Sequence, residues 1–226
     1  MATRPIVQLT RSGVALFGST RDLERLRREF DRYHCIRLPQ LLEPELWTWI
    51  QRLIPRSRFR ALLQLQGDCK ELCMAREDPV LAILDFLAND PRLFGLIRQM
   101  TGCGPIARFA GRVYRMVPGK GHTDAWHDDV GNYYLVAMSV NLSPGIYRGG
   151  ILQIRDKRSK RILSEVANTG FGDAVLFKLS EDLEHRLTDV EGPSSKTAYA
   201  GWFRSRPSYR RSLKKWLSQL NGTLKP

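Results

Sequence analysis

Residues 126–129 read Trp-His-Asp-Asp, and the rest of the chain is organised around this stretch. In an extended segment, side chains two residues apart point to the same face. His127 and Asp129 are therefore expected to reach one metal ion from the same side, while Asp128 points away. A second histidine from a neighbouring strand would complete a set of two imidazoles and one carboxylate. This donor set suits Fe(II), because three coordination positions stay open for a co-substrate and O2.

Apolar stretches of strand length lie on both sides of this motif, and turns rich in glycine and proline separate them. The predicted strands cover residues 107–117, 133–142, 151–155, 161–166, 174–179 and 196–204. Short strands joined by such turns favour an all-β sandwich or barrel-like core. His185 precedes the last of these strands, and Lys196 is its first residue.

The first hundred residues follow a different period. Apolar residues recur at helical spacing in residues 22–33, 44–54, 79–87 and 91–100. Asp90 is the expected N-cap of the last of these helices, and Gly102 ends it. A short strand is predicted at 35–38, and the mixed, basic residues 57–76 are assigned to loop and helix.

The expected organisation is a single α+β domain. It comprises a mostly helical flank at residues 1–105, a strand-rich core at 106–205 and a basic C-terminal helix at 206–226. The basic residues at and after Arg204 form either the solvated face of that helix or a docking site for an acidic partner.

The composition limits the class of partner. Lys and Arg number 36 against 23 Asp and Glu, so the formal net charge is +13. This charge favours an anionic partner, which is nucleic acid, a phosphorylated or carboxylated small molecule, or an acidic protein. No apolar run is long enough to span a bilayer, and no signal-peptide segment opens the chain, so we expect a cytoplasmic protein. The four cysteines are irregularly spaced and are expected to be buried, reduced thiols.

An ordered series of motifs extends over residues 108–204. It consists of Pro118-Gly119, His127-Asp128-Asp129, Val140-Asn141-Leu142, Gly149-Gly150, Gly-Asp-Ala-Val-Leu-Phe at 172–177, His185, Lys196 and Trp202-Phe203. The series resembles the Fe(II)/2-oxoglutarate-dependent dioxygenases, and among them the prolyl-hydroxylase-like group. The resemblance implies a double-stranded β-helix (jelly-roll) core with helices packed outside it.

The same resemblance implies a role for four residues. His127, Asp129 and His185 would be the iron ligands. Lys196 occupies the position of the basic residue that pairs with the distal carboxylate of 2-oxoglutarate. Many members have arginine there, whereas lysine supplies one compact charge and cannot form the bidentate fork. The implied cofactors are Fe(II), 2-oxoglutarate and O2, with ascorbate as an additional candidate.

Three further residues are candidates for the co-substrate pocket. Ser139 matches a strand position whose hydroxyl often helps to hold the distal carboxylate. Tyr114 lies on the strand that precedes the Pro-Gly turn. Trp202 shares the strand parity of Lys196 and should also face the interior of the barrel.

A second His-x-Asp sequence, His122-Thr123-Asp124, competes for the metal. The distance from the Pro118-Gly119 turn in the family pattern favours His127 and Asp129. His122 and Asp124 are then expected in a loop over the site, where they would contact substrate. Asp128 is either a solvated carboxylate or a group that orients a ligand histidine.

These observations predict an oxygenase that hydroxylates an unactivated C–H bond of a small molecule or of an amino-acid or peptidyl group. The substrate would be anionic or presented by an acidic carrier. One alternative is a nucleic-acid oxidative demethylase, motivated by the basic charge but less favoured. The other is a non-catalytic jelly-roll binding module.

Overall fold

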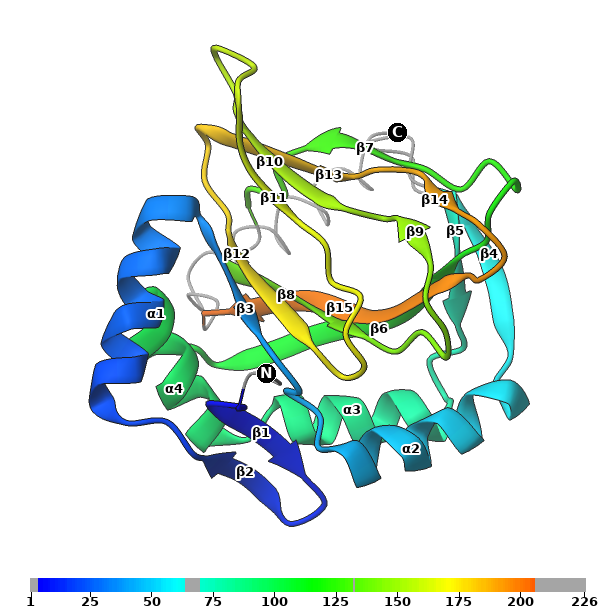
Figure 1. The fold of residues 1–226 in the computed structure, drawn as a ribbon, viewed down its shortest axis with the longest axis horizontal. Helices are drawn as coiled ribbons and strands as arrows, with labels where there is room; N and C mark the ends of the chain where they lie inside the picture. Colours follow the sequence, from blue (N-terminus) through cyan, green and yellow to red (C-terminus); the bar gives the residue numbers. More distant parts are fainter. Residues whose placement is uncertain (1–3, 64–69, 132, 206–226) are drawn as a thin grey trace, which may run out of the picture.

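The computed structural model describes residues 4–63, 70–131 and 133–205, and it places two β-sheets face to face with helices outside the larger one (Figure 1). The larger sheet has strand order β3-β12-β8-β15-β6-β5-β4, and the smaller has the order β11-β10-β13-β7. Two short two-stranded sheets, β1-β2 and β14-β9, lie beside them. The arrangement is the jelly roll with flanking helices that the resemblance implied.

The four helices and seven strands predicted from the sequence are present with closely similar bounds, whereas the other strands were not predicted. The helices are α1 (Thr20–Tyr33), α2 (Pro44–Leu53), the 3-10 turn η1 (Ile54–Arg56), α3 (Pro79–Ala88) and α4 (Pro91–Thr101). The first five strands are β1 (Val7–Thr10), β2 (Gly13–Leu16), β3 (Cys35–Leu38), β4 (Phe59–Leu63) and β5 (Lys70–Met74). The next five are β6 (Arg108–Met116), β7 (Asp124–His127), β8 (Tyr134–Asn141), β9 (Arg148–Gly149) and β10 (Leu152–Asp156). The last five are β11 (Ile162–Val166), β12 (Ala174–Lys178), β13 (Leu183–Leu187), β14 (Val190–Glu191) and β15 (Lys196–Arg204).

Strand β15 explains how the larger sheet serves both a core and a site. Tyr199 and Phe203 are buried on one face, where their rings contact Phe109 of β6 and, for Phe203, Phe94 of α4. Because side chains alternate along a strand, the even-numbered residues of β15 point to the other face, toward the smaller sheet. The helix-facing side of this sheet is therefore core, and the opposite side is free to form a site.

The helix boundaries follow the expected capping chemistry. The Asp90 carboxylate accepts a hydrogen bond from the Arg92 amide at the start of α4, and Gly102 ends that helix with a φ of 63°. At the start of α1, Ser19 and Asp22 form a reciprocal capping box. Helices α1 and α4 pack side by side across the outer face of the larger sheet (Figure 1).

The assignment of residues 57–76 to loop and helix was wrong. Strands β4 and β5 form a hairpin that extends the larger sheet, with Cys73 paired to Tyr114 of β6. The mixed, basic sequence shows no strand period, but the open edge of β6 supplies hydrogen bonds that favour a strand. The predicted C-terminal helix at 206–226 lies outside the described residues.

Two other expectations can be compared with the structure. Cys35, Cys73 and Cys103 are free thiols, and burial raises the pKa of each of them. Within the described ranges, every helix is too short or too polar to cross a bilayer.

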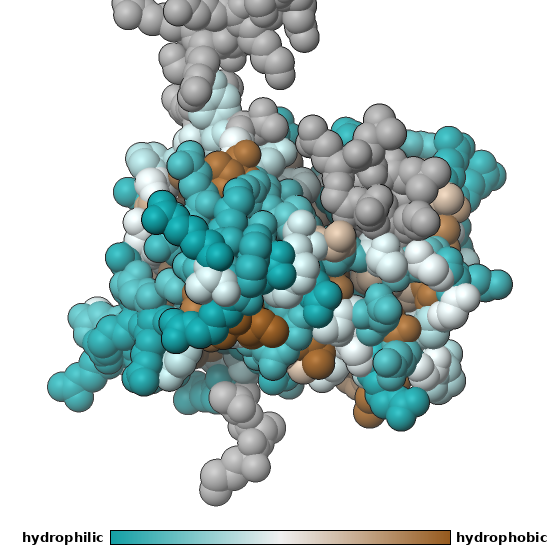
Figure 2. All heavy atoms as spheres, turned by 90° about the horizontal axis from the view of Figure 1, so that it is seen from above, coloured by the Kyte–Doolittle hydropathy of each residue, from teal (hydrophilic) through white to brown (hydrophobic). Residues whose placement is uncertain are grey.

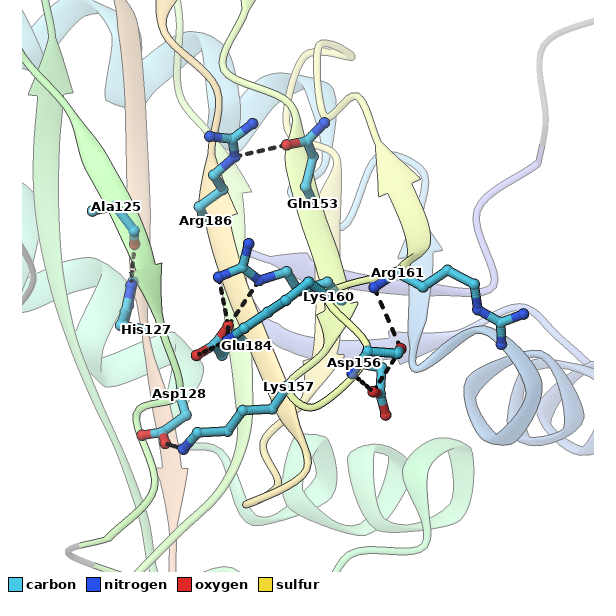
Figure 3. A network of polar contacts seen from close by, with 12 residues as sticks. Ala125, His127, Asp128, Gln153, Asp156, Lys157, Lys160, Arg161, Glu184 and Arg186 are labelled. Atoms are coloured by element: carbon cyan, nitrogen blue, oxygen red, sulfur yellow. Dashed lines mark hydrogen bonds and ion pairs between the residues drawn. The ribbon is translucent and has the colours of Figure 1, made fainter.

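The outer face of the smaller sheet is polar. The guanidinium carbons of Arg155 and Arg186 lie over the Trp126 ring, 3.9 and 4.8 Å from its centroid. Glu184 accepts from Arg155 and Lys160 on the same face (Figure 3). Seen from above, this side of the molecule is mainly hydrophilic with scattered hydrophobic residues (Figure 2). Because Glu184 and Arg186 point outward, His185 between them points inward.

Candidate metal and co-substrate site

Three potential metal ligands meet at the inner face of the smaller sheet. His127 on β7 and His185 on β13 are directly opposite in the antiparallel register, with ring centroids 4.3 Å apart. Oδ2 of Asp129 lies 3.6 Å from Nε2 of His127 and 3.4 Å from Nε2 of His185. The potential ligand atoms of the three residues lie within 4.8 Å of one another.

Asp129 reaches this cluster by a different route from the one expected. Strand β7 ends at His127, and Asp129 has a φ of 49°, in the left-handed region rather than in an extended segment. Aspartate tolerates this conformation better than most residues. The alternation argument was therefore wrong for Asp129, although the carboxylate still turns toward both imidazoles. Asp128 does point away, and its carboxylate accepts a hydrogen bond from Lys157 (Figure 3).

The backbone selects which nitrogen of His127 faces the cluster. Nδ1 of His127 lies 2.7 Å from the carbonyl oxygen of Ala125 (Figure 3). A carbonyl only accepts, so Nδ1 carries a proton and donates, and Nε2 is the nitrogen that would bind a metal once its own proton is lost. His185 is 6% exposed and packs against the Phe177 ring at 4.8 Å.

An indole from the larger sheet holds the carboxylate. Nε1 of Trp202 donates a hydrogen bond to Oδ2 of Asp129 at 2.8 Å. The Trp202 ring stacks on Tyr134 with a centroid distance of 4.8 Å and an interplanar angle of 11°. Sequence reasoning placed Trp202 inside the barrel but assigned it to the co-substrate rather than to Asp129.

The electrostatics of the cluster favour a cation. Burial alone would lower the pKa of His127, but the hydrogen bond to Asp129 and the charge of Asp124 raise it to about 9. Burial alone would raise the pKa of Asp129, but hydrogen bonds to both histidines hold it well below its usual range. A carboxylate held ionised between two imidazoles attracts positive charge. Two nitrogen donors and one carboxylate are also the donor set that fits Fe(II).

A cavity of about 560 Å³ between the two sheets contains this cluster, and Lys196, Tyr114 and Ser139 also line it. Lys196 and Trp202 are six residues apart on the cavity-facing side of β15. The residues of that side between them are Ala198 and Ala200, whose small side chains leave room. A fully extended strand rises about 3.3 Å per residue, so the two ends of this row are about 20 Å apart.

Lys196 is buried at one end of the cavity, with 2% of its surface exposed. Its Nζ donates to the carbonyl oxygen of Gly150 at 2.7 Å. Gly150 has a φ of 58°, and a Cβ at that position would lie 2.9 Å from Cδ of Lys196, so only glycine permits this approach. Burial lowers the pKa of Lys196 to about 8, and the charge of Asp124 opposes this shift only in part.

The residues of the second His-x-Asp sequence occupy different places. Nδ1 of His122 accepts a hydrogen bond from the Val117 amide at 2.8 Å and so braces the turn that follows β6. Asp124 is the first residue of β7, lines the cavity and lies 3.5 Å from Nδ1 of His127. Their expected contact with substrate stays a prediction.

One pair of cavity residues has no recognisable pattern in the sequence. Glu71 of β5 accepts a hydrogen bond from Nε of Arg112 at 2.6 Å, and its side chain is only 4% exposed. Both residues line the cavity. Glu71 lies on the hairpin that was not predicted, so its approach to Arg112 was not predicted either.

A jelly roll with two histidines and one aspartate facing its cavity defines a class of non-haem Fe(II) oxygenases. Residues 111–204 match the family model described as the 2OG-Fe(II) oxygenase superfamily. No curated protein matches the chain.

Solved structures with a similar fold share little sequence. A Pseudomonas putida prolyl-4-hydroxylase is 16% identical, with a TM-score of 0.61 over 81% of this chain and 99% of that one. A Trichoplax adhaerens prolyl hydroxylase, in complex with a hypoxia inducible factor peptide fragment, is 14% identical, with a TM-score of 0.59 over 82% and 90%. The epimerase SnoN from nogalamycin biosynthesis, in complex with Fe³⁺ and α-ketoglutarate, is 15% identical, with a TM-score of 0.60 over 83% and 85%. At these identities the likeness establishes the fold.

Proposed function

We propose that this chain is an Fe(II)- and 2-oxoglutarate-dependent oxygenase that hydroxylates a C–H bond. The observation that carries the proposal is one cavity with the cluster of His127, Asp129 and His185 on its wall and the buried ammonium of Lys196 at its end. An open metal site and a separate cationic anchor match the two ends of a dicarboxylic keto acid. Fe(II), 2-oxoglutarate and O2 together supply the oxidising chemistry, which releases succinate and CO2.

The residues of this chain position and enclose these groups. His127, His185 and Asp129 would hold the ion, and Lys196 would neutralise the distal carboxylate of 2-oxoglutarate. Trp202 fixes the orientation of Asp129 through its indole N–H. Tyr114 is 4% exposed on the same wall, and its bulk excludes water from the inner part of the cavity. Ser139 lines the cavity, and its hydroxyl would add a hydrogen bond to the carboxylate.

We propose a small molecule or a peptidyl group as the substrate, anionic or presented by an acidic carrier. The similar folds include a prolyl hydroxylase in complex with a peptide and an epimerase in complex with nogalamycin RO, so both substrate classes occur on this architecture. Ascorbate is an additional candidate for sustaining turnover.

The test is an anaerobic titration of the protein with Fe(II) and 2-oxoglutarate, followed through the visible charge-transfer band. We expect the band in the wild type and in Asp128→Ala, and its loss in Asp129→Ala. Succinate release under air should follow the same pattern. No 2-oxoglutarate binding in the wild type would refute the proposal. Biological activity retained by Asp129→Ala would favour a non-catalytic binding module.

The net charge of +13 supports a nucleic-acid demethylase as a second candidate. Phosphate contacts make affinity fall steeply with salt. If nucleic acid is the substrate, single-stranded DNA or RNA should bind in a salt-sensitive manner and stimulate succinate release. Binding without stimulation would reflect net charge alone.

A further inference from the structure

A buried amide on the cavity wall has one atom without a partner. Asn168 is 5% exposed and lies between β11 and β12. Its Nδ2 donates to the carbonyl oxygen of Ser139 at 3.0 Å. Among the described residues, no donor reaches its Oδ1, although that atom is buried. Buried acceptors without a donor are rare and costly, so we expect a hydrogen-bond donor at this oxygen.

The orientation of this amide follows from its surroundings. Turning the side chain over would place Oδ1 against the Ser139 carbonyl, and two acceptors repel each other. Nδ2 must therefore face Ser139, and Oδ1 is the atom left over. A group that satisfies Oδ1 has to donate a hydrogen bond.

Tyr147 links Asn168 to Lys196. The backbone carbonyl oxygen of Asn168 accepts a hydrogen bond from the Tyr147 hydroxyl at 2.7 Å. The Tyr147 ring centroid is 5.9 Å from Nζ of Lys196. Asn168, Ser139, Lys196 and Gly150 all line the same cavity. The unpaired acceptor thus lies on the wall of the cavity that would hold the distal carboxylate of the co-substrate.

A carboxylate cannot satisfy Oδ1 directly, because both groups only accept. Lys196 cannot form a bidentate fork, and one of its three N–H groups already serves Gly150. A water molecule would supply both missing donors, because it donates one hydrogen bond to Oδ1 of Asn168 and the other to the carboxylate. Buried waters typically occupy sites of this kind, with two to four polar partners.

We propose that Asn168 holds an ordered water that hydrogen-bonds the distal carboxylate of the keto acid, and that Asn168 thereby determines the chain length of the co-substrate. This inference rests on the proposed function. In the wild type, 2-oxoglutarate leaves space for the water. The longer 2-oxoadipate would have to displace the water and leave Oδ1 unpaired.

The test compares anaerobic affinities of the Fe(II)-loaded protein for 2-oxoglutarate and 2-oxoadipate. In Asn168→Ala we expect 2-oxoglutarate to bind roughly tenfold more weakly, because the water-mediated hydrogen bond to its carboxylate is lost. The preference for 2-oxoglutarate over 2-oxoadipate should shrink at the same time, because space is opened. Asn168→Ser, which restores a short acceptor, should recover part of both effects.

Trp47→Phe is the matched control. Nε1 of Trp47 is also buried without a partner among the described residues, but Trp47 does not line the cavity. This variant should bind both keto acids as the wild type does. An unchanged 2-oxoglutarate affinity in Asn168→Ala would overturn the inference, as would an equal loss for both keto acids. A wild type that binds Fe(II) but neither keto acid would refute the proposed function as well.

Discussion

At the scale of single residues, the site depends on charges that are kept out of water. Lys196 must stay protonated in order to bind a carboxylate, yet burial lowers its pKa to about 8. The same burial strengthens its attraction for an anion, because the surroundings screen the charge poorly. The Lys196 ammonium is therefore effective only within a limited range of pH.

We predict that the affinity for 2-oxoglutarate falls as the pH rises above about 8. Below that value the amine is charged and attracts the carboxylate, and above it the free protein holds a neutral amine. The loss should approach about tenfold per pH unit. Lys196→Arg should bind with little pH dependence from 7 to 9.5, since a guanidinium stays protonated. Titrations at several pH values measure this, and a flat wild-type profile would contradict it.

Trp202 offers a second prediction at this scale. Trp202→Phe removes the hydrogen bond to Asp129 but keeps a ring for the Tyr134 stack. Loss of a group that orients a metal ligand typically weakens metal affinity about 10- to 100-fold. Tyr134→Phe, which keeps the stack and the hydrogen bond, is the control and should bind metal normally. Competition with a chelator of known affinity provides the measurement, and equal affinities in both variants would argue against the role.

At the scale of elements, sequence patterns correctly predicted the features that depend on residues close together in the chain. The alternation of β15 and the cap and stop of α4 were read correctly, because strand period, Asp90 and Gly102 act locally. The features that were not predicted depend on contacts between residues far apart in the sequence. Hairpin β4–β5 becomes a strand pair through the edge of β6, and Asp129 reaches the histidines through a left-handed turn. Neither feature has a periodic signal in the sequence.

The Glu71–Arg112 pair should anchor the β4–β5 hairpin. Because the Glu71 side chain is 4% exposed, Glu71→Ala removes a nearly buried carboxylate together with its hydrogen bond from Nε of Arg112. We expect the free energy of unfolding to fall by about 1–3 kcal/mol. Glu29→Ala breaks an exposed pair with Arg25 and should cost about 0.5 kcal/mol or less. Urea unfolding of both variants checks this, and equal losses would show that burial of the pair is unimportant.

At the scale of the whole molecule, the metal site connects the two sheets. His127 and His185 belong to the smaller sheet, whereas Trp202 ties Asp129 to the larger one. An ion at this cluster would therefore join both layers of the jelly roll. Unfolding separates the layers and disperses the ligands, so the unfolded chain has no comparable site. Binding should consequently stabilise the entire fold.

Metal removal should thus lower the thermal stability of the whole protein. At a free-ion concentration 100 times the dissociation constant, binding adds about 2.7 kcal/mol. For a domain of this size, that corresponds to a rise in Tm of roughly 5–10 °C. Asp129→Ala should lose most of the rise, and Asp128→Ala should keep it, because its carboxylate pairs with Lys157 instead. Calorimetry under anaerobic conditions, with Fe(II) or with a chelator, separates these outcomes. A similar rise in Asp129→Ala would mean that the ion binds elsewhere.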